Sequence, residues 1–220
     1  MKHLFLTSAI GTPGVAESIR AKLGQNRPLK TVFISTPVEG EADQSDLSWV
    51  EEERVGLRKN HFDIFDYTIT GKKLPQIKDD LKDIEILYIS GGNNFYLKEK
   101  SNESGFESFV KEFVASGKIY IGSSCGSQIM GKDMSSILSM SDLDVLTKPV
   151  DTMGFGLVDF AILPHWGSEE FRENRLNKIS FDQMYGSTNP LIALNNYQYI
   201  EVVDDKFRII DVRNEKWNSF

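Results

Sequence analysis

Short apolar runs separated by turn residues recur along the first part of the chain. Each run is rich in β-branched and aromatic residues, which is typical of strands buried on both faces of a sheet. Five of these runs predict strands at residues 4–6, 31–34, 64–67, 84–89 and 119–121. Helical spacing of apolar residues between them predicts helices at 14–23, 48–59, 74–81 and 106–115. This alternation predicts an α/β fold of three layers, a mostly parallel sheet with helices on both faces.

The pattern changes after about residue 150. An apolar stretch at 155–164 predicts a strand, and a charged segment from residue 168 to about 181 predicts a helix. Three closing strands are expected at 191–194, 199–203 and 207–212, and Asp204-Asp205-Lys206 between the last two suits a hairpin. The polar, acidic stretch 37–45 is expected to be a solvated surface loop. Since no repeat or linker divides the chain, we expect one domain, residues 1–220.

Composition narrows the class of protein. A chain of 220 residues that is 40% hydrophobic can bury a full core. The net charge of -7 argues against binding to nucleic acid or to a membrane, which would need clustered Lys and Arg, so a short peptide or small molecule is the expected partner. Cys125 is the only cysteine, and the N-terminus lacks the apolar length of a signal peptide. We therefore expect a cytoplasmic protein without a disulfide, as a monomer or homodimer.

The main chemical signal is the segment Gly122-Ser123-Ser124-Cys125-Gly126, which directly follows the strand ending at residue 121. A strand, a tight turn and a helix are the context of a nucleophile elbow, in which small flanking residues let a serine hydroxyl project freely. The amide N–H of Cys125 would then face a developing oxyanion. A turn of this composition can also be a turn and nothing more, so the elbow needs a partner.

A general base is the first partner required, because a serine hydroxyl is a weak nucleophile until its proton is removed. The chain has three histidines. His3 and His61 lie at the starts of predicted strands, on the sheet edge opposite the reactive one. His165 ends a strand, at the edge where active sites of α/β sheets collect, and is the candidate base.

An acid that orients the imidazole is the next requirement. Asp142 lies between the serine and the histidine in the chain, with Asp144 as its nearest rival and Asp133 as a weaker one. The order Ser, Asp, His is that of α/β-hydrolases. There the acid normally comes much later in the chain, so this compact spacing favours a different fold.

A second glycine cluster, Ser90-Gly91-Gly92-Asn93-Asn94, follows the strand that ends at residue 89. Exposed N–H groups in such a turn can supply a second oxyanion donor. A phosphate or nucleotide loop is the alternative, but the cluster has neither GxGxxG nor a Walker lysine, so no nucleotide, metal or other cofactor is expected.

Together these residues resemble the peptidase E family of serine peptidases, which contains aspartyl dipeptidase and the cyanophycinases. Residues 89–97 are similar to the family's glycine-rich GGGNTF segment, residues 120–127 to its YIGxSAG elbow, and residues 157–165 to its strand ending in Pro-His. The resemblance extends over nearly the whole chain. It implies a fold related to class I glutamine amidotransferases, with the elbow after a central parallel strand.

The resemblance also implies roles for individual residues. Ser124 would be the nucleophile, His165 the base and Asp142 the acidic member, while the N–H groups of Gly91 and Cys125 would be the oxyanion donors. Cys125 stands where the family usually has alanine, and a cysteine is the nucleophile in the amidotransferases. Cys125 is therefore a rival nucleophile, although the register between the two elbow glycines favours Ser124.

Residues 169–175 are the candidate substrate-binding segment, because they are similar to the family's GETRxxR segment. Arg172 could hold a substrate carboxylate and Glu170 a free amino group. A solvated amphipathic helix is the alternative interpretation of the same charges. The resulting hypothesis is a serine peptidase that cleaves short peptides, including N-terminal Asp dipeptides, and the alternatives are a catalytically silent binding protein or a non-peptidase hydrolase.

Overall fold

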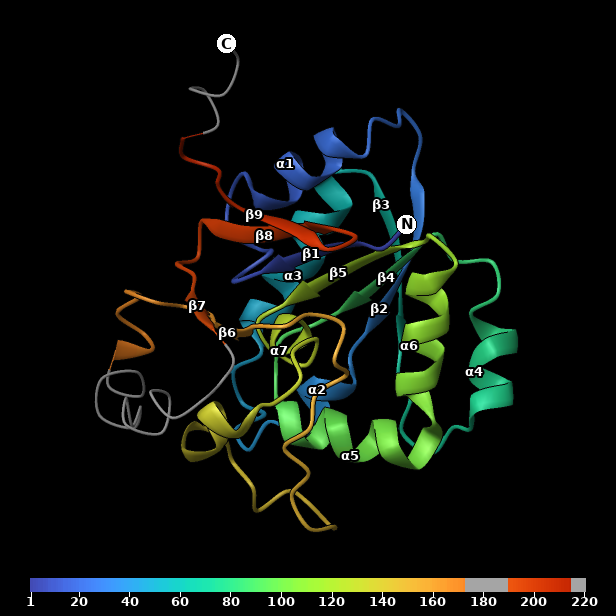
Figure 1. Ribbon diagram of the computed structural model, residues 1–220, viewed down its shortest axis with the longest axis vertical. Helices are drawn as coiled ribbons and strands as arrows, with labels where there is room; N and C mark the ends of the chain where they lie inside the picture. Colours follow the sequence, from blue (N-terminus) through green and yellow to red (C-terminus); the bar gives the residue numbers. More distant parts are fainter. Residues whose placement is uncertain (173–189, 215–220) are drawn as a thin grey trace.

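The central feature of the computed structural model, which describes residues 1–172 and 190–214, is a seven-stranded sheet (Figure 1). Its strand order is β3-β2-β4-β5-β1-β8-β9. The strands are β1 (His3–Thr7), β2 (Leu29–Ile34), β3 (Phe62–Tyr67), β4 (Ile86–Ile89), β5 (Ile119–Ser123), β8 (Gln198–Val203) and β9 (Lys206–Asp211). The first five run parallel to one another, whereas β8 is antiparallel to both β1 and β9. The expected mostly parallel sheet is confirmed.

Helices cover both faces of this sheet (Figure 1). They are α1 (Val15–Lys22), α2 (Thr36–Glu39), α3 (Ser48–Lys59), α4 (Leu74–Asp80), α5 (Asn94–Ser104), α6 (Phe106–Ala115) and α7 (Cys125–Gln128). Apolar residues of α1 and α3 pack on one face, and those of α4, α5 and α6 pack on the other. The three-layer α/β architecture is thus confirmed.

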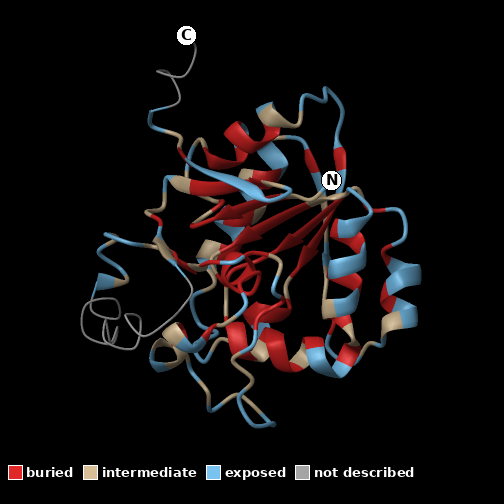
Figure 2. Cartoon of the chain, viewed as in Figure 1, coloured by how far each residue is buried: buried red, intermediate tan, exposed pale blue. Residues whose placement is uncertain are grey.

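Burial follows this layering, and the central strands and inner helix faces are the most enclosed parts of the molecule (Figure 2). In α6, Phe106, Phe109 and Phe113 recur at helical spacing and all three side chains are buried. Their rings are neighbours, with centroids 5.8 Å apart for the first pair and 5.9 Å for the second. Burial of large aromatic side chains is a major source of core stability, so this helix fixes one outer layer.

The C-terminal hairpin forms as expected. Strands β8 and β9 pair antiparallel, and Val203 lies opposite Lys206. The turn residue Asp204 has φ 55, a conformation that short aspartate side chains tolerate. Pairing of β8 with β1 then ties the C-terminal part of the chain to the parallel strands.

Two further strands form a separate parallel pair, β6 (Ala161–Leu163) with β7 (Leu191–Ala193). The strand expected at 155–164 is therefore shorter than predicted and lies outside the main sheet. Most of the charged helix expected from residue 168 to about 181 falls outside the described residues. Within the described ranges, no helix is both long enough and apolar enough to cross a membrane.

The stretch 37–45 differs from its expectation as a solvated loop. Its first residues belong to α2, in which Thr36, Pro37 and Val38 are buried. Residues 42–45 are exposed, as expected. A polar composition could not reveal that the start of this stretch packs against the glycine-rich turn after β4, where the amide of Asn93 donates to the carbonyl of Pro37 at 2.9 Å.

Candidate active site

Ser124 stands at the carboxyl end of the central strand β5, immediately before α7. Its backbone has φ 47 and ψ -105, a strained conformation for a residue with a side chain. Its amide donates to the carbonyl of Thr7 at 3.1 Å, which fixes the turn to β1. A Cβ atom on Gly126 would overlap the carbonyl of Ile89, so the helix can approach β4 only because this residue is glycine. Strand, strained turn and helix thus give the elbow geometry.

The Ser124 side chain meets the imidazole of His165. The distance between Ser124 Oγ and His165 Nε2 is 2.9 Å. The amide of His165 donates to Ser8 Oγ at 2.7 Å, and its ring stacks on Phe171 with centroids 4.3 Å apart. His165 follows β6, which brings it to the elbow although it lies far along the chain from Ser124.

Asn196 lies at the other nitrogen of the same ring. Its Oδ1 is 2.8 Å from His165 Nδ1, and it also accepts from Ser8 Oγ at 3.2 Å. Asn196 follows β7, the parallel partner of β6, so both residues emerge at the same end of that strand pair. An acceptor at Nδ1 keeps the ring proton there, and the lone pair of Nε2 then faces the serine hydroxyl.

The structure puts Asp142, the acid expected from the sequence, elsewhere. Its side chain is exposed, its Oδ1 accepts from the amide of Asp144 at 2.9 Å, and its carbonyl accepts from Asn93 Nδ2 at 2.7 Å. The rival Asp133 accepts from Ser135 instead. In the turn that follows the 3-10 helix (Ser135–Met140), the Asp142 carboxylate faces the backbone amide of Asp144. The position at Nδ1 belongs to a neutral amide in this geometry.

Among the backbone amides near Ser124 that lack an acceptor within the described part of the chain, two are candidate oxyanion donors. One belongs to Cys125, the first residue of α7, where helix N–H groups have no intrahelical partner. The other belongs to Gly92, which lines the cleft in front of Ser124. The amide of Gly91, the donor expected from the sequence, instead points to Glu53 Oε1 at 3.3 Å.

Glu53 is a site residue that sequence reasoning missed. It comes from α3, is 5% exposed, and its Oε2 accepts from Ser90 Oγ at 2.7 Å. Burial, the largest influence on this carboxyl, raises its pKa, and the hydrogen bonds from Ser90 and Gly91 oppose the rise. A glutamate on a charged helix looks like a solvated residue in sequence, and no local pattern marks it as buried. It links α3 to the glycine-rich turn beside the nucleophile.

Cys125, the rival nucleophile, has its side chain in the apolar core. It is 0% exposed and packs within the same cluster as Ile89 and Ile129. Burial raises the pKa of the Cys125 thiol well above its usual range, and the nearby carboxylates of Glu41 and Glu53 add to the rise. A buried neutral thiol is a poor nucleophile, so the geometry favours the serine beside it.

The cleft in front of Ser124 has a volume of about 550 Å³. Glu170 lines it, whereas Arg172 is exposed and pairs with Glu169, with a shortest N–O distance of 3.3 Å. Residues 173–175 of the same segment lie outside the described residues. Across the residues that the structure describes, no three His, Cys, Asp or Glu side chains gather to hold a metal ion.

Several known proteins with similar sequences or folds are named as peptidases. A peptidase of Pasteurella multocida, named as uncharacterized, is 28% identical over 96% of this chain and 97% of its own length. A peptidase E of Shewanella sp. strain ANA-3 is 31% identical over 43% of this chain and 38% of its own. A solved structure of a Listeria monocytogenes EGD-e protein assigned to peptidase E has the same fold, with a TM-score of 0.81, 23% identity, and coverage of 96% of this chain and 98% of that one.

The family model of peptidase family S51 matches residues 6–210 of the chain. This match contains both the elbow and His165, and among the described strands it leaves out only residues 3–5 of β1 and residue 211 of β9. The expected relationship to peptidase E is confirmed. The chain belongs to peptidase family S51 and is a serine-type peptidase.

Proposed function

We propose that this peptidase hydrolyses short peptides through an acyl-enzyme formed on Ser124. The observation that carries the proposal is the 2.9 Å contact between Ser124 Oγ and His165 Nε2 at the floor of an open cleft. A hydroxyl within hydrogen-bond reach of an unprotonated imidazole nitrogen can be activated by general-base catalysis. Because the cleft is small, it accommodates a short peptide better than a folded protein.

In the proposed reaction, Ser124 Oγ attacks the scissile carbonyl carbon while its proton passes to His165 Nε2. The tetrahedral intermediate collapses when the C–N bond breaks, and the leaving amine takes the proton from Nε2. A water molecule then gives a proton to Nε2 while its oxygen attacks the ester carbonyl carbon. The second intermediate collapses when the C–Oγ bond breaks, Oγ takes the proton back from Nε2, and the acid product leaves. Each half of the reaction uses the same imidazole, first as base and then as acid.

The intermediate carries a negative oxygen that needs hydrogen-bond donors. The amide of Cys125 at the start of α7 is the first proposed donor, because it lacks an acceptor among the described residues and a helix N-terminus favours negative charge. The amide of Gly92 is the second. Gly91 could join them only by giving up its bond to Glu53, so we propose that it shapes the turn instead.

Asn196 is proposed to take the place expected for Asp142 in the catalytic mechanism. Its Oδ1 supports the imidazole tautomer in which Nε2 is free to accept the serine proton. An amide has no charge, so it stabilises the imidazolium less than a carboxylate would. The protein would therefore use orientation more than electrostatics at this position.

This assignment makes a prediction for Asn196→Asp. A carboxylate beside the ring stabilises the protonated imidazole, so the acidic limb of the kcat/KM profile should move to higher pH by about one unit. Above that limb we expect a several-fold higher rate. Asn195→Asp is the matched control, since Asn195 Oδ1 accepts from the amide of Tyr197. An Asn196→Asp profile that overlays both the wild-type and the control profile would contradict the role.

A preference for N-terminal Asp dipeptides is the narrower form of the proposal. It would need a cation near the cleft to hold the substrate carboxylate. Arg172 gives this form little support, because its side chain is 63% exposed in the structure and its guanidinium pairs with Glu169. We therefore propose short peptides as the class and leave the Asp dipeptides as one arm of the test.

The test is hydrolysis of a dipeptide and tripeptide library by the purified protein. Hydrolysis is measured through the new amino groups that it releases. The library contains free and acetylated N-termini and acidic, neutral and basic side chains. We expect a subset to be cleaved by the wild type and none by Ser124→Ala. Absence of cleavage throughout the library, with the chain folded, would contradict the proposal.

A further inference from the structure

The charge of the active-site cleft points to the chemistry of its substrate. Four glutamates line the cleft that contains Ser124 and His165: Glu41, Glu52, Glu53 and Glu170. None of its described lining residues is a lysine or arginine. A second cleft that Ser124 also lines, about 370 Å³ in volume, is lined by further carboxylates, those of Asp43 and Asp142.

Glu41 lies at the junction, since it lines both clefts together with Ser124. Its carboxylate makes no hydrogen bond or ion pair with another described residue, in contrast to Glu53, which is bonded to Ser90 and Gly91. Burial raises the pKa of Glu41, and the like charge of Asp142 raises it further. A partly desolvated carboxylate without a cation beside it is stabilised when a positive group of a ligand binds next to it.

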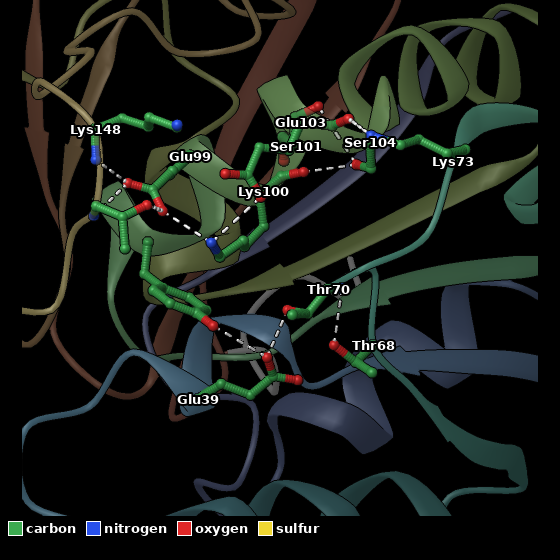
Figure 3. Close-up of polar contacts among 12 residues, drawn as sticks. Glu39, Thr68, Thr70, Lys73, Glu99, Lys100, Ser101, Glu103, Ser104 and Lys148 are labelled. Carbon is green, nitrogen blue, oxygen red and sulfur yellow. Dashed lines mark hydrogen bonds and ion pairs between the residues drawn. The ribbon is translucent and has the colours of Figure 1, made fainter.

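The backbone around Glu41 is held firmly against the nucleophile side of the sheet. A Cβ on Gly40 would overlap the side chain of Tyr96 in α5, so the chain passes there only because the residue is glycine. Glu39 accepts from Thr70 Oγ1 at 2.6 Å (Figure 3), and Gln44 Nε2 donates to the carbonyl of Glu41 at 2.8 Å. These contacts hold the backbone of Glu41 in place beside the cleft that Ser124 also lines.

The described cations near the cleft are engaged elsewhere. Arg54 follows Glu53 in α3, but its guanidinium bonds to Asp66 at 2.7 Å and lies over the ring of Phe33. Arg172 pairs with Glu169 at the surface. The carboxylates of the cleft therefore have no described cation to neutralise them, and a low-dielectric cleft lined by one sign of charge concentrates its field on a bound ligand.

We propose that the cleft selects peptides with a positively charged group, and that Glu41 is the carboxylate that contacts it. This inference rests on the proposed peptidase function. The charged group can come from two sources with the same chemistry, a free α-ammonium group or the side chain of Lys or Arg. In both cases a charge-assisted hydrogen bond forms to a carboxylate oxygen. An acidic side chain in the same place would be repelled.

The experiment compares kcat/KM for matched peptides in the wild type, Glu41→Gln and Glu112→Gln, the last an exposed carboxylate on α6 far from the cleft. Lysine is paired with norleucine and glutamate at the same position, each with a free and an acetylated N-terminus. We expect the cationic member of the preferred pair to exceed its neutral partner by about 10-fold in the wild type and in Glu112→Gln. In Glu41→Gln that ratio should fall towards one. Acetylation of the N-terminus removes the α-ammonium charge. A preference that is lost on acetylation therefore belongs to the α-ammonium group, and one that is kept belongs to the side chain.

Labelling with an uncharged fluorophosphonate separates the possible failures. If the wild type is labelled and cleaves peptides, but prefers neutral or acidic ones or keeps its ratio in Glu41→Gln, the inference is wrong and the peptidase proposal stands. If the wild type is neither labelled nor active, both are wrong. A preference that weakens with rising salt would support an electrostatic origin.

Discussion

Replacing Ser124 by alanine is expected to reduce kcat/KM for any cleaved peptide by about 10³- to 10⁶-fold. The variant loses the oxygen that we propose forms the acyl-enzyme, but it keeps the cleft and the imidazole in place. The remaining rate should come from the oxyanion donors and from substrate binding alone. The measurement is initial-rate kinetics on the best peptide of the library, with folding followed by circular dichroism.

Cys125→Ala is the matched control for this variant. It removes the neighbouring thiol but keeps the backbone amide that we propose as an oxyanion donor. Because the thiol is fully buried in the core, the substitution should lower stability slightly and leave kcat/KM within about threefold of the wild type. Activity that survives in Ser124→Ala and disappears in Cys125→Ala would reverse the assignment of the nucleophile.

His165→Gln is expected to cost as much activity as Ser124→Ala, again about 10³- to 10⁶-fold. Glutamine can occupy much of the ring's space, but it cannot accept the hydroxyl proton. Because nucleophile and base act as one unit, the double variant Ser124→Ala/His165→Gln should be no slower than either single variant. The double-mutant cycle is measured with the same peptide and the same enzyme concentrations.

His61→Gln provides the comparison for the base. His61 precedes β3, at the end of the sheet away from Ser124, and is exposed. Its replacement should leave the kinetics unchanged. Losses that simply multiply in the double variant would show that Ser124 and His165 act independently. A His165→Gln variant as active as His61→Gln would show that His165 is not the base.

The elbow and the histidine could be predicted from the sequence because each depends on local structure. Gly122, Ser124 and Gly126 directly follow an apolar strand, and strand ends fix the edge at which side chains emerge. His165 could be found by elimination among three histidines. The structure brings these two residues together at 2.9 Å.

The partner of the histidine was missed for a physical reason. The sequence predicts an acid there, whereas Asn196 is neutral, so no carboxylate pattern indicates it. Its position depends on the parallel pairing of β6 with β7, a long-range contact that apolar patterns do not specify. The available signal was its place just after a predicted strand, the same context that identified His165.

Glu41 and Glu53 show a second limit of sequence patterns. Both lie in charged segments, so hydrophobic periodicity assigns them to solvent. The structure buries most of Glu53 between α3 and the glycine-rich turn, and the packing of α2 against α5 brings Glu41 to the cleft. Such placements arise from contacts between elements far apart in the chain. They also determine the charge that a substrate meets.

The most direct test of the central claim is to locate a covalent adduct on the wild-type chain. The full-length protein is treated with a fluorophosphonate, digested, and sequenced by tandem mass spectrometry, with His165→Gln treated in parallel. We expect one adduct per chain, on Ser124, which forms much more slowly in His165→Gln. An adduct on another residue, or an unmodified Ser124 in folded wild-type protein, would contradict the account.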